Sequence, residues 1–175
     1  MLPNFVLTGF MGCGKSTVGR RLAALTGHRF VDTDELIVKT QNKSIPEIFA
    51  EVGEEGFRDI EQSVLRDLVG VAGVVLSTGG GAILREENRE ALKKVGVIVW
   101  LDADPDVLFE RASRSTRRPL LQTDNPRETF DRLFEGRKSI YEALADFRFD
   151  STNIEHDIVA RKVLEQAMRC HAQRP

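Results

Sequence analysis

The chain has 175 residues, with 41% hydrophobic and 30% charged residues and a formal net charge of −2. This length suits one domain with a sizeable core, and the near-neutral charge gives no sign of a nucleic-acid or membrane partner. No apolar run reaches the length of a bilayer span, and the chain enters a strand at its N-terminus, so we expect no signal peptide. We therefore expect a single domain over residues 1–175 that works in the cytoplasm.

The two cysteines, Cys13 and Cys170, form no disulfide or metal pattern. A chain without a cysteine framework fits a reducing compartment. The three histidines, His28, His156 and His171, lack metal-ligand spacing, so we interpret them as surface or structural residues.

Residues 9–17, Gly-Phe-Met-Gly-Cys-Gly-Lys-Ser-Thr, fit the phosphate-binding pattern of a glycine, four residues and then Gly-Lys-Ser. An apolar strand is predicted before them, over 5–7, and a helical pattern follows until Gly27. This order directs backbone N–H groups and the positive end of a helix dipole at one point, which favours an anion. Lys15 would reach the outer phosphates of a nucleoside triphosphate, and the Ser16 hydroxyl would bind a bridging magnesium ion. The residues expected to contact the nucleotide are Gly12, Cys13, Gly14, Lys15, Ser16 and Thr17.

Asp32 and Asp34 close a second short strand, predicted over 28–32. If the strand continues, the two carboxylates point the same way. One would then hold magnesium through water near the phosphate loop, and the other would face the acceptor as a general base or positioning group. The alternative is a helix N-cap with a solvated acid, because aspartate is favoured at helix starts. Beside a phosphate-binding motif we prefer the functional interpretation.

Helical patterns follow over residues 36–41, over a capping box at 44–47 and the turns after it, and over 54–69. Within the last pattern, Arg58 and Glu61 lie three positions apart on one helical face. By itself, this spacing favours a solvated ion pair.

Gly79, Gly80 and Gly81 directly follow a buried strand predicted over 74–76. Three consecutive glycines lose much conformational entropy on folding, so they need a compensating reason, such as close approach of the backbone to a ligand. A tight loop without function is the alternative.

The rest of the chain continues the alternation, with strands at 97–101 and 147–150 and helices at 86–94, from 105, from 126 and at about 155–170. Five short strands separated by helices imply the α/β class: three layers, with a central five-stranded parallel sheet covered on both faces. Ligands of such sheets bind at the carboxyl ends of the strands. The phosphate motif, the aspartates and the triple glycine all follow strand ends, so we expect them to meet in one crevice.

Periodicity fails from Ser113 to Asn125, where Arg114, Arg117 and Arg118 gather. An irregular connection of this length is often an active-site lid, and its arginines would neutralise a transferring phosphoryl group. An exposed basic loop is the alternative.

These motifs, taken in order, resemble those of the shikimate kinase family over nearly the whole chain. They are residues 9–17, Asp-Thr-Asp at 32–34, Gly-Glu-Glu-Gly-Phe-Arg at 53–58 with Glu61, Gly-Gly-Gly at 79–81, Arg-Pro-Leu-Leu at 118–121, and Arg137 with Tyr141. The first motif is common to many nucleotide-binding proteins, whereas the ordered set is far more specific. The resemblance implies a fold like that of the nucleoside monophosphate kinases, with substrate-binding helices over about 33–61 and a lid over about 112–125.

The resemblance also implies ATP-dependent phosphorylation of the 3-hydroxyl of shikimate, in chorismate and aromatic amino-acid biosynthesis, with Mg²⁺ as cofactor. It assigns the ring hydroxyls of shikimate to Asp34 and its carboxylate to Arg58 and Arg137. The expected acceptor site also includes Glu61 and the triple glycine, with Gly80 touching the substrate.

On the nucleotide side, the resemblance gives Asp32 a role in holding magnesium beside Ser16, Arg118 a contact with the phosphates, and Arg111 a place near adenine. The catalytic groups would be Lys15, Asp34 and Arg118. Two departures from the family pattern are Cys13, where alanine or serine is usual, and Ser139-Ile140-Tyr141 in place of Pro-Leu-Tyr.

The chemistry of shikimate agrees with these residues, because a carboxylate needs cationic forks and a hydroxyl needs an acceptor. An ordinary aspartate, with a pKa near ~4, cannot hold an alkoxide at equilibrium, so Asp34 would orient the hydroxyl and accept its proton late. Two alternatives stay open: a kinase for another small polyol acid such as gluconate, and a nucleotide-dependent switch without transfer activity. We expect the chain to act as a monomer.

Overall fold

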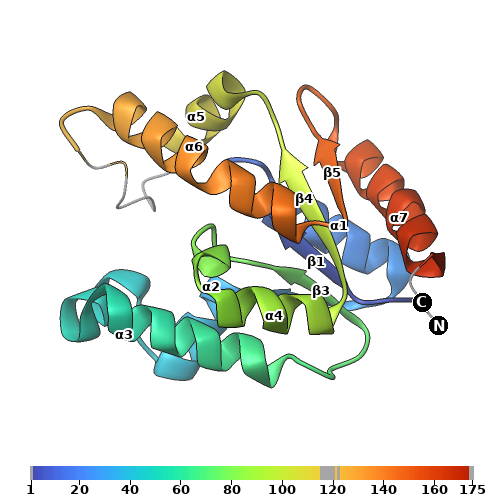
Figure 1. Cartoon of the computed structure of the whole chain (residues 1–175), viewed down its shortest axis with the longest axis horizontal. Coiled ribbons are helices and arrows are strands. Elements are labelled where there is room, and N and C mark those ends of the chain that lie inside the picture. The colour runs from blue at the N-terminus through green and yellow to red at the C-terminus, as the bar shows by residue number, and fades with distance from the viewer. Residues whose placement is uncertain (1, 115–120, 122, 174–175) are drawn as a thin grey trace.

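The computed structural model of the protein describes residues 2–114, 121 and 123–173 (Figure 1). At its centre lies a sheet of five strands, β1 (Phe5–Thr8), β2 (Arg29–Asp32), β3 (Val74–Ser77), β4 (Val97–Asp102) and β5 (Phe147–Asp150). The strands lie in the order β2-β3-β1-β4-β5, and every neighbouring pair is parallel. The predicted α/β class with a five-stranded parallel sheet is therefore confirmed.

Helices connect the strands and form the two outer layers. They are α1 (Lys15–Thr26), α2 (Thr33–Gln41), α3 (Ile45–Asp67), α4 (Glu86–Val95), α5 (Pro105–Ser113), α6 (Pro126–Leu144) and α7 (His156–Ala172), with a short 3₁₀ helix, η1 (Ala82–Leu84). In Figure 1, α1 and α7 pack together on one face of the sheet, and α4 and α6 cover the other. Among the described residues, no helix combines the length and apolarity that a bilayer crossing requires.

The middle strand, β1, determines where the phosphate loop lies. All of its residues are buried, as expected for an apolar run in a sheet covered on both faces. Phe5 pairs with Val75 of β3 on one side and with Val97 of β4 on the other. The chain therefore leaves β1 at the centre of the carboxyl edge, and the loop from Gly9 to Gly14 begins between two neighbouring strands.

The helices α2 and α3 have a small core of their own. Its buried members are Ile37, Ile48, Phe57 and Val64. Two helical segments were predicted on either side of Gly53, and the structure joins them into one kinked helix. Gly53 forms the kink with φ 69° and ψ −174°, a left-handed backbone that is strained for other residues. Beyond this kink, α3 carries Arg58 and Glu61 back toward the sheet.

Stacking between Trp100 of β4 and Tyr141 of α6 ties α6 to the sheet. The two rings lie 5.9 Å apart at an angle of 17°, and both side chains are buried. Because Arg137 lies one helical turn before Tyr141, this packing also fixes the position of Arg137.

Candidate functional site

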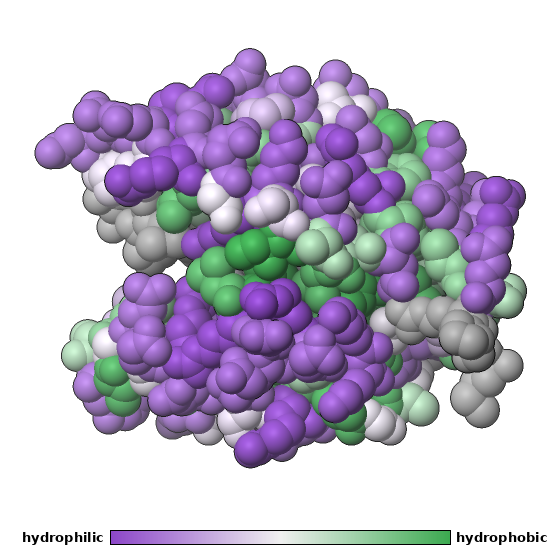
Figure 2. Space-filling model, in the orientation of Figure 1, coloured by the Kyte–Doolittle hydropathy of each residue, from purple (hydrophilic) through white to green (hydrophobic). Residues whose placement is uncertain are grey.

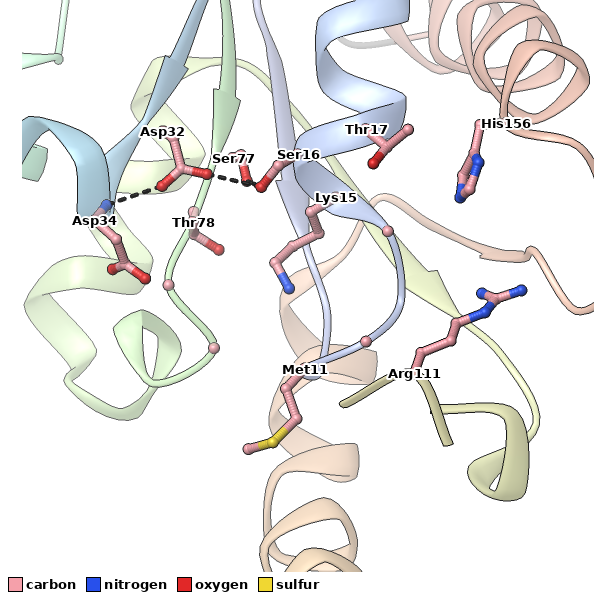
Figure 3. Close-up of a pocket in the computed structure, with 14 residues that line it drawn as sticks. Met11, Lys15, Ser16, Thr17, Asp32, Asp34, Ser77, Thr78, Arg111 and His156 are labelled. Carbon is pink, nitrogen blue, oxygen red and sulfur yellow. Dashed lines mark hydrogen bonds between the residues drawn. The ribbon is translucent and has the colours of Figure 1, made fainter. Parts of the chain in front are cut away.

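The carboxyl ends of β1, β2 and β3 meet at a cavity of about 430 Å³ (Figure 3). Its walls come from the phosphate loop, the strand ends and the helices α5 and α7, through Met11, Gly12, Gly14, Lys15, Ser16, Thr17, Asp32, Asp34, Ser77, Thr78, Gly79, Gly80, Arg111 and His156. The structure thus brings the phosphate motif, the two aspartates and two of the three glycines into one crevice, where ligands of parallel sheets bind.

The phosphate loop leaves the start of α1 open toward this cavity. Gly14 stands at the N-cap in a left-handed conformation, with φ 89°. Within the described part of the chain, no side chain accepts a hydrogen bond from the first turn of α1. The first N–H groups of the helix and the positive end of its dipole are therefore available for an anion.

Lys15 spans the loop from the inside. Its Nζ donates to the carbonyl oxygens of Gly9, at 2.7 Å, and Phe10, at 3.1 Å, and lies 3.6 Å from the buried Sγ of Cys13. These contacts hold the ammonium group within the cavity, close to the N–H groups of α1 that would bind an anion.

Asp32 has two roles, because its two oxygens face different partners. Oδ1 accepts from the backbone N–H groups of Asp34, at 3.0 Å, and Glu35, at 3.4 Å, and so caps α2. Oδ2 accepts from the Ser16 hydroxyl at 2.8 Å, and the Ser77 hydroxyl lies 3.5 Å from that of Ser16. A carboxylate and hydroxyls gathered beside a phosphate loop are the oxygen ligands that Mg²⁺ prefers. Both interpretations of Asp32, as cap and as possible metal ligand, are compatible with this geometry.

Asp34 lines the cavity as a helical residue, not as a residue of a continued strand. The strand ends at Asp32, and Asp34 belongs to the first turn of α2. The premise of a continued strand is therefore wrong, because the capping bonds of Asp32 turn the chain into a helix. The Asp34 carboxylate still lines the cavity, and a Cβ added to Gly79 would lie 2.8 Å from its Oδ1.

Arg58 and Glu61 form a buried ion pair, so the solvated pair that their spacing favours is wrong. Arg58 Nη1 lies 2.8 Å from Glu61 Oε2, and the Arg58 and Glu61 side chains are 12% and 1% exposed. Burial raises the pKa of Glu61, and the neighbouring Arg58 opposes that rise. Spacing along a helix cannot show which helical face is covered by the rest of the protein. Here the triple-glycine loop covers the face of α3 that carries Arg58 and Glu61. A Cβ on Gly81 would lie only 2.5 Å from Arg58 Nη2.

Arg137 approaches the same loop from α6. It is buried, and its Nη1 donates to the carbonyl oxygen of Gly80 at 3.2 Å. The Tyr141 hydroxyl donates to that oxygen at 2.8 Å, and burial raises the pKa of Tyr141, so the hydroxyl keeps its proton. Burial lowers the pKa of Arg137, and the nearby charge of Arg58 lowers it further. Two cations from distant parts of the chain thus converge on the triple glycine.

Arg137 has an unusual charge environment. Among the described residues, no carboxylate forms an ion pair with its guanidinium, whose neighbours include the Gly80 carbonyl and the Phe10 ring, 5.5 Å away. The charge of Glu54 favours the Arg137 cation without forming an ion pair with it, and the charge of Arg58 disfavours it. Burying a cation without an ion-pair partner is unfavourable, and a bound anion would relieve the penalty. Arg58, Glu61 and Arg137 stand beside the triple glycine, and neither they nor Gly81 are part of the cavity wall described above.

Arg111 and His156 line the cavity on its far side from Asp34 (Figure 3). His156 was interpreted as a surface or structural residue, and the structure adds that the start of α7 places its half-buried imidazole in the cavity wall. The sequence could have indicated this, because His156 follows the carboxyl end of the last predicted strand, where ligands of parallel sheets bind. Met11, Ser77 and Thr78 were also missed as lining residues. Arg117 and Arg118 lie outside the described residues, so their roles stay predictions.

The close approach of Gly81 to Arg58 gives a first testable prediction. In Gly81→Ala the new methyl group should displace the guanidinium, because it would lie 2.5 Å from Nη2 and 2.7 Å from Nη1. We expect KM for the acceptor to rise at least about tenfold, the effect of losing roughly 1.4 kcal/mol of a charged contact. Melting temperature should fall less than in Arg58→Ala, since the end of the long side chain can move and keep part of its contact with Glu61.

The matched control is Gly136→Ala, because Gly136 lies within α6 and has open space where the methyl group would go. This variant should keep its KM values and gain about 1 kcal/mol of stability from helix propensity. An unchanged acceptor KM in Gly81→Ala would show that the position of Arg58 does not matter for binding.

Comparisons with known proteins agree with this geometry. The model of the shikimate kinase family matches residues 11–168. The shikimate kinase of Thermodesulfovibrio yellowstonii is 44% identical over 168 residues, which cover 96% of each chain. The solved shikimate kinase of Acinetobacter baumannii, in complex with shikimate, has a TM-score of 0.92 at 39% identity, over 97% of this chain and 94% of that one.

A gluconokinase structure from Sinorhizobium meliloti has a TM-score of 0.61 at 17% identity, over 98% of this chain and 97% of that one. At this identity the likeness shows a shared fold alone. The family match and the relatives span nearly the whole length of this sequence at far higher identity. The chain belongs to the shikimate kinase family.

Proposed function

We propose that the chain transfers the γ-phosphoryl group of ATP to the 3-hydroxyl of shikimate and releases shikimate 3-phosphate and ADP. The observation that carries this proposal is the buried Arg137 beside Arg58 at the triple glycine. Two guanidinium groups at one place suit a carboxylate, which shikimate carries on its ring. The product would serve chorismate and aromatic amino-acid biosynthesis.

The nucleotide side of the proposed reaction rests on the loop from Gly12 to Thr17. Its N–H groups and the start of α1 would hold the phosphates, and Lys15 would leave the Gly9 and Phe10 carbonyls to contact them. Bound Mg²⁺ would neutralise phosphate charge, and Ser16 and Asp32 are the residues that would hold it. Arg111 would lie near adenine, and Arg118 would contact the phosphates.

The acceptor side rests on Asp34, whose carboxylate lies in the cavity beside Gly79. Phosphoryl transfer passes through a loose transition state, so the protein mainly positions the reactants and neutralises charge. Asp34 would orient the 3-hydroxyl toward the phosphate and accept its proton late. Glu61 would hold Arg58 in place, and the Tyr141 hydroxyl would hold the Gly80 carbonyl.

We also propose that the chain is a single domain that acts as a monomer in the cytoplasm, with ATP and shikimate as its small-molecule partners. Every group named in this mechanism comes from the same chain, so the proposed site needs no second copy. No step in it uses a nucleic acid or a membrane.

A coupled assay that follows ADP release with Mg-ATP tests the reaction. Shikimate should support turnover, whereas gluconate and buffer alone should support less than about 1% of that rate, because they lack the matching carboxylate and hydroxyl set. Turnover with gluconate and not shikimate would identify a kinase for another polyol acid. ADP release independent of acceptor, or none at all despite nucleotide binding, would favour a switch protein.

A further inference from the structure

Thr33 lies between the two aspartates of the cavity but is hidden from the cavity itself. It is the first residue of α2, and the whole residue is 0% exposed. Asp32 and Asp34 are part of the cavity wall, whereas Thr33 is not. Its side chain therefore makes no contact with a ligand in the cavity, and any effect that it has on the reaction must pass through a neighbouring residue.

The neighbour that Thr33 holds is Gly79, the first residue of the triple glycine. The N–H of Gly79 donates a hydrogen bond to Thr33 Oγ1 at 2.9 Å. The strands β2 and β3 pair up to Asp32 and Ser77, and beyond this pair β2 turns into α2 while β3 leads into the glycines. The Thr33 hydroxyl thus connects the two segments at the point where their backbones part.

The position of Gly79 sets the space beside two carboxylates. A Cβ on Gly79 would lie 2.8 Å from Asp34 Oδ1 and 3.2 Å from Glu61 Oε1, so the backbone of this glycine packs closely against both side chains. Asp34 is the residue that would orient the acceptor hydroxyl, and Glu61 is paired with Arg58. A shift of Gly79 would either press on these carboxylates or open a gap beside them.

The residues on either side of Gly79 are held by other elements. The backbone N–H and the hydroxyl of Thr78 both donate to the carbonyl oxygen of Leu7 in β1, at 3.1 and 3.3 Å. The carbonyl oxygen of Gly80 accepts from the Tyr141 hydroxyl of α6 at 2.8 Å. Glycines have wide conformational freedom, so bonds from outside the loop must select one arrangement. Thr33 supplies such a bond from α2.

We propose that Thr33 is a positioning residue for the acceptor side of the reaction. Its hydroxyl holds the N–H of Gly79, and this bond keeps the triple glycine in place against Asp34 and Glu61. The inference rests on the proposed function, because it is Asp34 that would orient the acceptor hydroxyl there. Position matters at this point, since a small displacement of reacting groups lowers the rate of transfer strongly.

Steady-state kinetics of Thr33→Val with Mg-ATP and shikimate test the inference. Valine has nearly the shape of threonine but accepts no hydrogen bond, so Gly79 loses its partner. The value of kcat/KM for shikimate should fall about tenfold, through a higher KM and a lower kcat, as expected for a lost hydrogen bond that positions a reacting group. KM for ATP should stay within about twofold, because the bonds of Asp32 to Ser16 and to the start of α2 remain.

Two further variants at the same position make a graded series. Thr33→Ser keeps the hydroxyl and should recover most of the lost rate. Thr33→Cys has a sulfur that accepts only weakly, so its kcat/KM should fall between those of the serine and valine variants. The order serine, cysteine, valine does not depend on the valine variant alone, and the first two variants still test the inference if the third does not fold.

Thr40→Val is the matched control, because it makes the same change on the same helix. Thr40 is exposed, and its hydroxyl donates to the carbonyl oxygen of Ile37 within α2, at 3.1 Å. This variant should match wild type in both KM values. Melting temperatures are measured alongside, since a bond with a purely structural role would lower the melting temperature of Thr33→Val and leave the kinetics of the folded enzyme unchanged.

Amide hydrogen exchange followed by NMR tests the hydrogen bond itself in wild type. The amide of Gly79 should exchange more slowly than an unprotected glycine, and Thr33→Val should remove this protection. Fast exchange of Gly79 in wild type would overturn the inference. A series in which kcat/KM for shikimate does not follow the acceptor strength at position 33 would overturn it too, and so would a rise in KM for ATP as large as that for shikimate.

The same measurements separate this inference from the proposed function. If wild type does not phosphorylate shikimate, the proposed function fails and the inference fails with it. If wild type phosphorylates shikimate and the three variants at Thr33 do so equally well, only the inference is overturned.

Discussion

Lys15→Met should lower kcat by at least about a hundredfold, since removing one preorganised charge from a phosphoryl-transfer site costs about 3 kcal/mol or more in the transition state. In the free protein the ammonium group donates to the carbonyl oxygens of Gly9 and Phe10, so it is already held within the loop. During transfer it would neutralise the charge that develops on the phosphates. Methionine has a similar length and apolar stem, but it cannot supply this charge.

The melting temperature of Lys15→Met without ligand should stay close to that of wild type, because Lys15 is half-buried and lines the cavity, where water can replace its hydrogen bonds to the loop carbonyls. ADP should still bind, though more weakly, since the backbone N–H groups at the start of α1 remain. Lys39→Met, at an exposed position on α2, is the matched control and should keep full activity. More than about a tenth of wild-type turnover in Lys15→Met would contradict a role in charge stabilisation.

The phosphate loop could be predicted from sequence because all of its parts are neighbours in the chain. Strand, glycines, lysine and helix occur within residues 5–26, so the motif by itself contains the geometry. Asp32 shows where this local approach fails. Its side chain caps α2, which turns Asp34 into a helical residue, and local competition between strand and helix decides the direction of both carboxylates.

The acceptor side depends on contacts between distant segments, which patterns cannot show. The Arg137 guanidinium and the Gly80 carbonyl are 57 positions apart in sequence and 3.2 Å apart in space. Burial of Glu61 follows from the packing of α3 against the glycine loop, and helical spacing does not reveal it. Resemblance to a family supplied these residues, whereas His156, which no motif includes, was found only in the structure.

Arg137→Ala should raise KM for shikimate about thirtyfold or more while KM for ATP stays nearly constant, since breaking a buried charged contact typically costs about 2–5 kcal/mol. The protein itself should lose little stability. Within the described residues no carboxylate pairs with Arg137, and the Tyr141 hydroxyl still donates to the Gly80 carbonyl after the change. Arg132→Ala, at an exposed position on α6, is the matched control and should leave both KM values unchanged.

Arg58→Ala should raise KM for shikimate to a similar degree, but it should also destabilise the protein. It leaves Glu61 buried without its partner, which raises the pKa of that carboxyl further. A carboxyl whose folded-state pKa is raised destabilises the fold as the pH rises above its ordinary value. The melting temperature of Arg58→Ala should therefore fall more steeply than that of wild type as the pH increases from 5 to 8.

The methyl ester of shikimate tests whether Arg58 and Arg137 bind the substrate carboxylate or have only a structural role. The ester keeps the ring and its three hydroxyls but lacks the charge, so wild type should use it at least about tenfold less well than shikimate, as kcat/KM. Either alanine variant should lower kcat/KM for the ester little further, because the interaction that the ester lacks is the one that the substitution removes. If wild type phosphorylates the ester as well as it does shikimate, the convergence of Arg58 and Arg137 on the triple glycine is structural, and the assignment of the acceptor fails.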